Sequence, residues 1–224
     1  MNKLLIIILL GFISFGTVSK AKYFEGVVEY DLSYKPIHKN SAIDYLEQNY
    51  GVKEFLYYKN GFYKRVKLNK EGDTVSVIIH NPQLKKIYGS HVSTGDTIMT
   101  YSTLENVMKS FNMKELKKTV VNGKKVNGVE LHLELKDEFV FDEYRSQNTK
   151  YYFSKKYKID PNNHKDQKDG FYNELVNSYP YLVLKMILND GYIKEETKVF
   201  TKIERKAIDD NTFVIDDSKP IKEI

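Results

Sequence analysis

The 224-residue chain contains no cysteine and no tryptophan, and it has only 12 glycines and 5 prolines. The absence of cysteine excludes disulfides, cysteine-ligated metal sites, thiol catalysis and a lipid-modified N-terminal cysteine. Stability must therefore come from the packed core. What the chain does contain is 18 tyrosines and 12 phenylalanines. A chain rich in tyrosine and poor in glycine, with alternating patterns, favours antiparallel sheet joined by short turns.

The first 21 residues have the layout of a cleavable signal peptide. Lys3 precedes an apolar run from Leu4 to Val18, and small residues at Ser19 and Ala21 predict cleavage after Ala21. The run is short for a bilayer span, which needs about 20 residues, so no stable transmembrane anchor is expected after cleavage. An uncleaved anchor remains the alternative. Loss of the leader lowers the formal charge from +5 to +3, too little to indicate a nucleic acid partner.

Two segments with a period of two flank the turn at 189–191 and predict a long β-hairpin. Before the turn, the even-numbered residues from Leu182 to Leu188 are apolar. After it, Val199 and Ile203 share the face that we expect to be buried. The opposite face carries Lys194, Glu196 and Lys198, and this pattern predicts that those charges meet solvent.

The rest of the chain continues as short strands and turns. Asn60-Gly61 separates two strand-like segments and predicts a type I′ hairpin, because both central residues of that turn need positive φ. Asn122-Gly123 and Asn127-Gly128 are further turn signals. Helical spacing recurs over residues 41–50, 103–111 and 171–179. We therefore expect a mostly β (α+β) fold in a single domain over residues 22–224, with two or three short helices.

The order of these segments resembles a known group of proteins. The resemblance is carried by FEGVVEY directly after the leader, YYFSKKYKIDP at Tyr151–Pro161, and the stretch from Tyr179 to Asp216. They are similar to an uncharacterised exported Gram-negative family with the outer-membrane lipoprotein carrier-like (LolA-like, LppX-like) fold. The resemblance implies a periplasmic protein, or a secreted one, with a curved antiparallel half-barrel sheet and helices over its concave face. It implies no catalytic residues.

Members of the wider fold hold lipids or acyl chains in that concavity, and the resemblance implies such a ligand here. The apolar strand faces supply the candidate groove. Its predicted lining is Val28, Tyr30, Leu32, Leu131, Leu133, Leu182, Leu184, Met186, Leu188, Val199 and Ile203. A plain filled core has the same pattern, because buried strand faces look alike with or without a ligand. In that alternative, the chain is an envelope protein-interaction module without a small ligand.

No pattern in the sequence indicates an enzyme, a cofactor or a metal. The five histidines lack metal-ligand spacing, and no nucleophile elbow, phosphate loop or dinucleotide fingerprint occurs. The polar stretch 159–170 could offer oxygen ligands to calcium, but Lys165 and Phe171 stand where an EF-hand needs glycine and glutamate. A hydrolase with residues assembled in space remains the third alternative. The lysines between 114 and 125 are interpreted as a solvated sheet edge.

Overall fold

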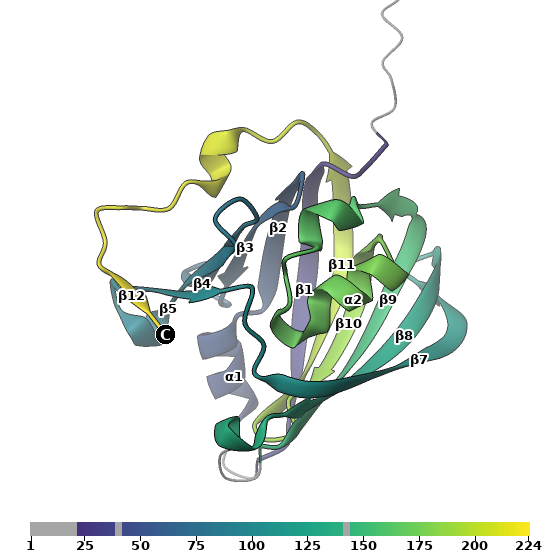
Figure 1. The fold of residues 1–224 in the computed structure, drawn as a ribbon, viewed down its shortest axis with the longest axis horizontal. Helices are drawn as coiled ribbons and strands as arrows, with labels where there is room; N and C mark the ends of the chain where they lie inside the picture. Colours follow the sequence, from purple (N-terminus) through teal and green to yellow (C-terminus); the bar gives the residue numbers. More distant parts are fainter. Residues whose placement is uncertain (1–21, 39–41, 141–143) are drawn as a thin grey trace, which may run out of the picture.

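The computed structural model describes residues 22–38, 42–140 and 144–224, so the predicted leader lies outside the described residues. These residues form one twelve-stranded sheet with the order β12-β6-β5-β4-β3-β2-β1-β11-β10-β9-β8-β7 (Figure 1). The mostly β prediction is confirmed. The expectation of a wholly antiparallel sheet was wrong at one edge, because β12 runs parallel to β6. The sheet is open, since its edge strands β12 and β7 are not neighbours.

The elements alternate strands with short helical turns. The strands are β1 Gly26–Pro36, β2 Lys53–Lys59, β3 Phe62–Leu68, β4 Thr74–Asn81, β5 Lys86–His91, β6 Ile98–Ser102, β7 Met108–Val121, β8 Lys124–Leu135, β9 Ser146–Lys158, β10 Tyr181–Asn189, β11 Lys194–Arg205 and β12 Ile221–Glu223. The α-helices are α1 Ile43–Tyr50 and α2 Tyr172–Ser178. The 3-10 turns are η1 Val92–Thr94, η2 Asp137–Phe139, η3 Pro161–His164, η4 Asp169–Phe171 and η5 Asp210–Phe213.

The first strand of the described residues joins the two halves of the sheet. β1 pairs with β2 on one side and with β11 on the other, so β2–β6 and β7–β11 form two wings around it. Two predicted hairpins are confirmed: β10–β11, and β2–β3 around Asn60-Gly61, where φ is 49° and 85°. Asn122-Gly123 likewise turns β7 into β8, whereas Asn127-Gly128 lies inside β8 and was wrongly predicted as a turn.

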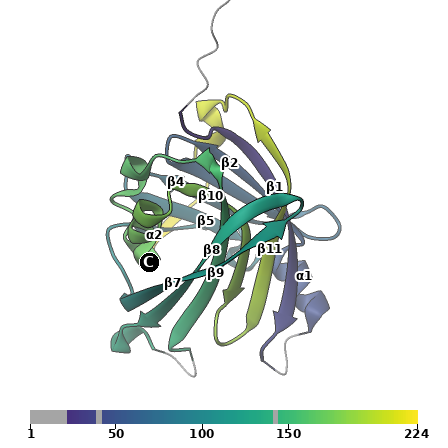
Figure 2. The same ribbon diagram turned by 90° about the vertical axis from the view of Figure 1, so that its right-hand side faces the viewer.

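Two of the three predicted helices are present. α1 packs Leu46 against Leu32 and Tyr34 near the end of β1. α2 lies on the inner side of the bent sheet (Figure 2), where its Val176 joins the main core cluster. The helix predicted over residues 103–111 was wrong, because Met108 already begins β7. The backbone there pairs with β8, and a spacing of three and four residues does not prevent an edge strand when a partner strand is available.

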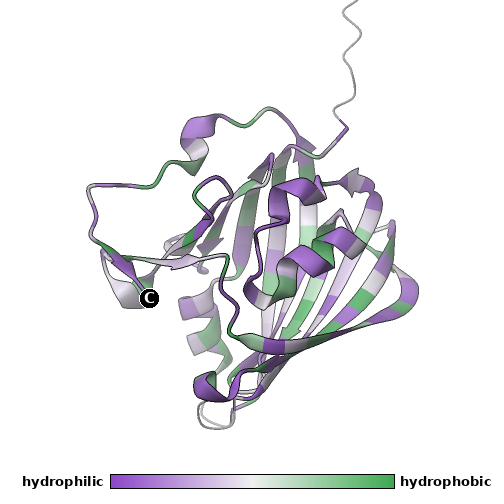
Figure 3. Ribbon diagram, viewed as in Figure 1, coloured by the Kyte–Doolittle hydropathy of each residue, from purple (hydrophilic) through white to green (hydrophobic). Residues whose placement is uncertain are grey.

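We call the side of the sheet that bears Tyr30 and faces α2 the inner face. Apolar and polar residues alternate along β8 (Figure 3), and its inner residues pack in the core. β11 does the reverse. Lys194, Glu196 and Lys198 are buried, so the expectation that they meet solvent was wrong. They oppose the inward-facing residues of β1, and the charges are tolerated because opposite charges lie beside them.

The register of β1 with β11 explains why Val199 and Ile203, which were predicted to share a face, lie on different faces of β11. Val28 and Tyr30 of β1 oppose Ile203 and Phe200 of β11, so Thr201 is an extra residue in the pairing. Such a bulge shifts the following side chains to the other face. Ile203 therefore opposes an inward-facing residue, whereas Val199 opposes the exposed Asp31 on the outer face.

Candidate functional site

The inner face of the sheet and the segment 159–172 enclose a cavity of about 290 Å³. Its lining comes from both wings, from β2 to β6 on one side and from β8 to β11 on the other. Apolar and aromatic side chains form most of the wall. Four charged residues also line it: Glu54, Arg65, Lys198 and Asp169.

Three of these charges form an ionic floor on the sheet. The Glu54 side chain is completely buried, and it accepts hydrogen bonds from Arg65 Nε (3.2 Å), Arg65 Nη2 (3.0 Å) and Lys198 Nζ (2.9 Å). Burial alone would raise the pKa of the Glu54 carboxyl, but the charges of Arg65 and Lys198 outweigh it and hold that pKa far below its usual range. Glu54 therefore stays ionised.

The ionic floor continues along β11 and β3. Lys67 Nζ lies 3.0 Å from a Glu196 carboxylate oxygen, and both side chains are largely buried. Lys198 also lies over the Tyr30 ring, 4.8 Å from its centroid. Burial lowers the pKa of the Lys198 ammonium, and Glu54 opposes that shift. The two wings of the sheet are therefore joined through charges as well as through β1.

Tyrosine side chains surround the ionic floor. Tyr63, Tyr101, Tyr151 and Tyr172 line the cavity, and burial raises the pKa of each phenol, that of Tyr101 to about 12. Their hydroxyls therefore remain protonated at neutral pH and can donate hydrogen bonds. The Tyr30 hydroxyl differs, because it donates to the Val183 carbonyl at 2.7 Å.

Asp169 lies on the segment 159–172, which we call the covering segment, and it lines the same cavity. Its Oδ1 atom is buried and has no hydrogen-bond partner among the described residues. Burial raises the pKa of this carboxyl to about 6. An unpaired buried carboxylate oxygen is costly, so the position destabilises the empty protein.

A chain of hydrogen bonds fixes the covering segment onto the sheet. His164 Nδ1 donates to Gln167 Oε1 (3.0 Å), which leaves Nε2 to accept from the Tyr58 hydroxyl (2.9 Å). Gln167 Nε2 in turn donates to the Tyr63 hydroxyl at 3.3 Å. Burial lowers the pKa of His164. It also lowers the pKa of His80, whose ring stacks on that of His164, to about 4. Both rings are therefore neutral at pH 7.

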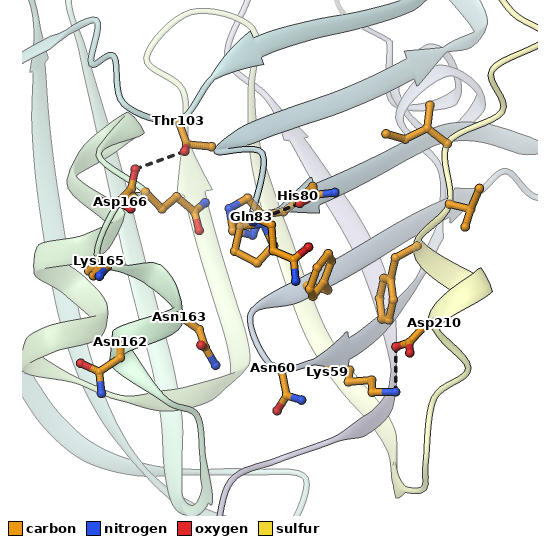
Figure 4. Close-up of a pocket in the computed structure, with 17 residues that line it drawn as sticks. Lys59, Asn60, His80, Gln83, Thr103, Asn162, Asn163, Lys165, Asp166 and Asp210 are labelled. Carbon is orange, nitrogen blue, oxygen red and sulfur yellow. Dashed lines mark hydrogen bonds and ion pairs between the residues drawn. The ribbon is translucent and has the colours of Figure 1, made fainter.

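A second, more open cleft of about 790 Å³ adjoins the cavity (Figure 4). It lies between the β2–β3 turn, the β4–β5 turn, η3 and η5, and polar side chains such as Asn60, Gln83 and Asn163 line it. The Lys59 ammonium is 2.8 Å from the Asp210 carboxylate at one end, and the Thr103 hydroxyl donates to the Asp166 carbonyl at the other. Gln167 lines both the cleft and the cavity and so separates the two.

The predicted groove residues divide into three groups in the structure. Tyr30, Leu133, Leu182 and Met186 come together in the cavity lining. The structure places the others elsewhere. The second group packs in core clusters and comprises Val28, Leu184, Leu131 and Leu32. The third group is partly buried and does not line the cavity; it comprises Leu188, Val199 and Ile203.

Sequence reasoning missed Glu54 and Arg65, placed Lys198 on a solvent-facing surface, and considered Asp169 only within a polar stretch that could offer oxygen ligands to calcium. A signal for two of them existed: the two-residue turn Asn60-Gly61 fixes the register of β2 with β3, which pairs Leu56 with Arg65 and Glu54 with Lys67. Opposite charges on one face of a hairpin could have been recognised from that register. No local signal brings Lys198 to Glu54, because the two residues are 144 positions apart.

The chain matches no protein family model and no curated protein. Among solved structures, two structures of PNGF-II are similar to this chain, with TM-scores of 0.45 and 0.46 and 13% identity. These matches cover 90% of this chain and 31% of the PNGF-II chain, so this chain spans about a third of that protein. Mycobacterium tuberculosis lipoprotein LppX matches with a TM-score of 0.38 and 7% identity, over 83% of this chain and 89% of LppX.

A LolA superfamily protein from Nitrosomonas europaea also matches, with a TM-score of 0.38 and 8% identity, over 87% of this chain and 92% of that protein. The two groups that the sequence resembles are therefore both among the matched structures. Within residues 22–38, 42–140 and 144–224, no helix is long and apolar enough to cross a bilayer. The same residues contain no group of three potential metal ligands.

Proposed function

We propose that this protein is exported to the periplasm and binds a small amphipathic molecule, a lipid or another compound with an apolar chain, in the inner cavity. The observation that carries the proposal is a cavity of about 290 Å³ with apolar walls and a few convergent polar groups. Ligand sites have this composition, and their volumes begin at about 300 Å³. The predicted leader supports export, and the resemblance to carrier folds supports an apolar ligand.

The proposed role is binding without catalysis. Two of the titratable groups at and behind the cavity wall are held by protein partners: Glu54 by two cations, and His164 between Tyr58 and Gln167. Such groups orient a ligand but are poorly placed to exchange protons with it. The apolar part of the ligand would contact Leu133, Leu182 and Met186, and each Å² of apolar surface buried there contributes about 25 cal/mol.

The alternative role, an envelope interaction module, is favoured by a different part of the surface. A hollow near the start of β7 is lined by Leu104, Val107 and Phe139, all of which are exposed. Exposed apolar side chains gathered in one place are a feature of contact surfaces. This hollow and the inner cavity do not share lining residues, so the two roles can be tested separately.

Native mass spectrometry tests the proposed role directly. Protein purified from a periplasmic extract without detergent should carry an apolar adduct of one ligand per chain, which lipid analysis then identifies. Recombinant Met186→Trp, which fills the cavity, should lose uptake of a fluorescent fatty-acid analogue. Ile187→Trp is the matched control, because Ile187 is the next residue of β10 and does not line the cavity. Equal uptake by Met186→Trp and the unchanged protein would contradict binding in this cavity.

A further inference from the structure

We infer that the ligand of the inner cavity carries an anionic head group, a carboxylate or a phosphate, which binds against Arg65 and Lys198. This inference rests on the proposed function and adds the chemical class of the ligand. It depends on the balance of donors and acceptors at the ionic floor.

The ionic floor has more cationic donors than it uses. Arg65 has five N–H groups and Lys198 has three. Arg65 gives two of them to Glu54, and Lys198 gives one. Among the described residues, no other hydrogen bond is formed by either cation. Two positive charges therefore face the cavity with one negative charge between them, and the neighbouring Lys67 and Glu196 neutralise each other.

Burial shows which charge faces the ligand. The Glu54 side chain is 0% exposed, whereas the Arg65 side chain is 28% exposed. The carboxylate is thus covered, whereas the Arg65 side chain lines the cavity and is partly accessible. Arginine in this arrangement recognises carboxylate and phosphate groups through paired N–H donors.

The surrounding tyrosines add neutral donors to the same place. The Tyr63 hydroxyl accepts the Gln167 amide N–H, so its own proton is free to be donated. Tyr151 and Tyr172 line the cavity too, and each interacts electrostatically with Arg65. An anion at the ionic floor would therefore meet two cations and up to three hydroxyl donors, and no uncovered acceptor of the sheet.

Asp169 is the one unpaired acid in the cavity lining, and it argues for the opposite charge on the ligand. It belongs to the covering segment, and among the described residues no ion pair joins it to Arg65 or Lys198. Asp169 and Arg65 both interact electrostatically with Tyr63 and Tyr172, so both charges border the space that the ligand would fill. Ligands of opposite charge therefore test which of the two charges decides binding.

The test compares four ligands with the same eight-carbon chain: octanoate, octyl phosphate, 1-octanol and octylammonium. Binding to the full mature chain is measured by displacement of a fluorescent apolar probe at pH 7.5. We expect one or both anions to bind at least about tenfold more tightly than octanol, since hydrogen bonds to charged groups exceed neutral ones by about that factor. The stronger of the two anions distinguishes a fatty acid from a phosphorylated head group.

The outcomes separate the inference from the function on which it rests. If none of the four ligands displaces the probe, the proposed function fails. Equal binding of anions and octanol, or tighter binding of octylammonium, would overturn the anionic head group and leave the cavity function standing.

Two variants localise the effect. Lys198→Met keeps Glu54 paired with Arg65 and should reduce anion affinity about tenfold relative to octanol affinity. Tyr172→Phe removes one hydroxyl with little change in shape and should weaken anions alone, by a smaller factor. Tyr57→Phe is the control, because Tyr57 does not line the cavity. Anion affinity that is unchanged in both Lys198→Met and Tyr172→Phe, with the proteins folded, would also overturn the inference.

Discussion

The two walls of the inner face are built from opposite residue types, although both include fully buried side chains. On β8 and β10, the inward side chains are leucines such as Leu131 and Leu184, each at most 1% exposed. On β2, β3 and β11, the inward side chains include Glu54, Arg65 and Lys198. The charged wall can be buried because its charges pair within hydrogen-bonding distance, whereas the leucines need only be packed.

The difference shows what burial on a strand requires. Alternation identifies which residues share a face, but it does not say which of the two faces is covered. For β11 the covered face is the charged one, because its neighbour β1 and the next strand, β2, bring Tyr30 and Glu54 to Lys198. The charged wall therefore depends on long-range partners, and the leucine wall depends mainly on volume.

Breaking the charged wall should have the largest effect. Arg65→Ala leaves the fully buried Glu54 with Lys198 alone, and loss of one partner of a buried ion pair costs about 3–5 kcal/mol of unfolding free energy. Urea denaturation at pH 7 measures it. Lys64→Ala is the matched control on the outer face of β3, with an expected change within about 0.5 kcal/mol.

A second substitution sharpens the cause. Adding Glu54→Gln to Arg65→Ala removes the orphaned charge, so the double variant should recover part of the lost stability. If the double variant is less stable than Arg65→Ala by the full cost of another lost contact, the charge of Glu54 is not what destabilises the single variant.

The leucine wall should show a graded response that follows packing. Leu184 is 0% exposed in the main core, so Leu184→Ala should cost about 2–5 kcal/mol through lost contacts and the space left behind. Met186, two residues along β10, borders the existing cavity, so Met186→Ala should cost clearly less. Thermal and urea unfolding of the two variants measure the difference. Equal costs would mean that the cavity is filled by protein in solution.

Local chemistry made much of the fold predictable. Asn60-Gly61 predicts its hairpin because the turn needs positive φ at both residues, and the structure has φ of 49° and 85° there. Residues 103–111 were misread because Leu104, Val107 and Phe111 have helical spacing while remaining exposed beside an edge strand. Turn chemistry assigns the hairpin. Spacing alone does not assign residues 103–111, because pairing with β8 decides the structure of that segment.

The site was less predictable than the fold, for a physical reason. The predicted apolar lining brought Tyr30, Leu133, Leu182 and Met186 to the cavity, because each lies on a face with apolar alternation. Lys198 reaches Glu54 only because β1 pairs with β11. The bulge at Thr201 also changes which face of the sheet the residues of β11 occupy. A bulge and a pairing between the two ends of the chain leave no local pattern.

The covering segment provides the smallest and most specific test, through the pH dependence of Asp169. Its folded pKa is about 6, above the ordinary value of 3.8, because the carboxyl is buried. Between those two pH values the folded state binds more protons than the unfolded state, so this group lowers stability as pH rises. The cost is fully present above pH 7 and absent below pH 4, and it is on the order of 3 kcal/mol.

Asp169→Asn removes this titration. The stability of the variant relative to the unchanged protein should therefore increase between pH 4 and pH 7, as measured by urea unfolding at several pH values. His80, with a pKa lowered to about 4 by burial, contributes the opposite trend, since it loses stability as pH falls from 6.5 to 4. Both proteins contain His80, so its contribution cancels in the difference. A difference that stays constant with pH would mean that Asp169 is solvated, and that the covering segment closes the cavity less tightly than the two walls imply.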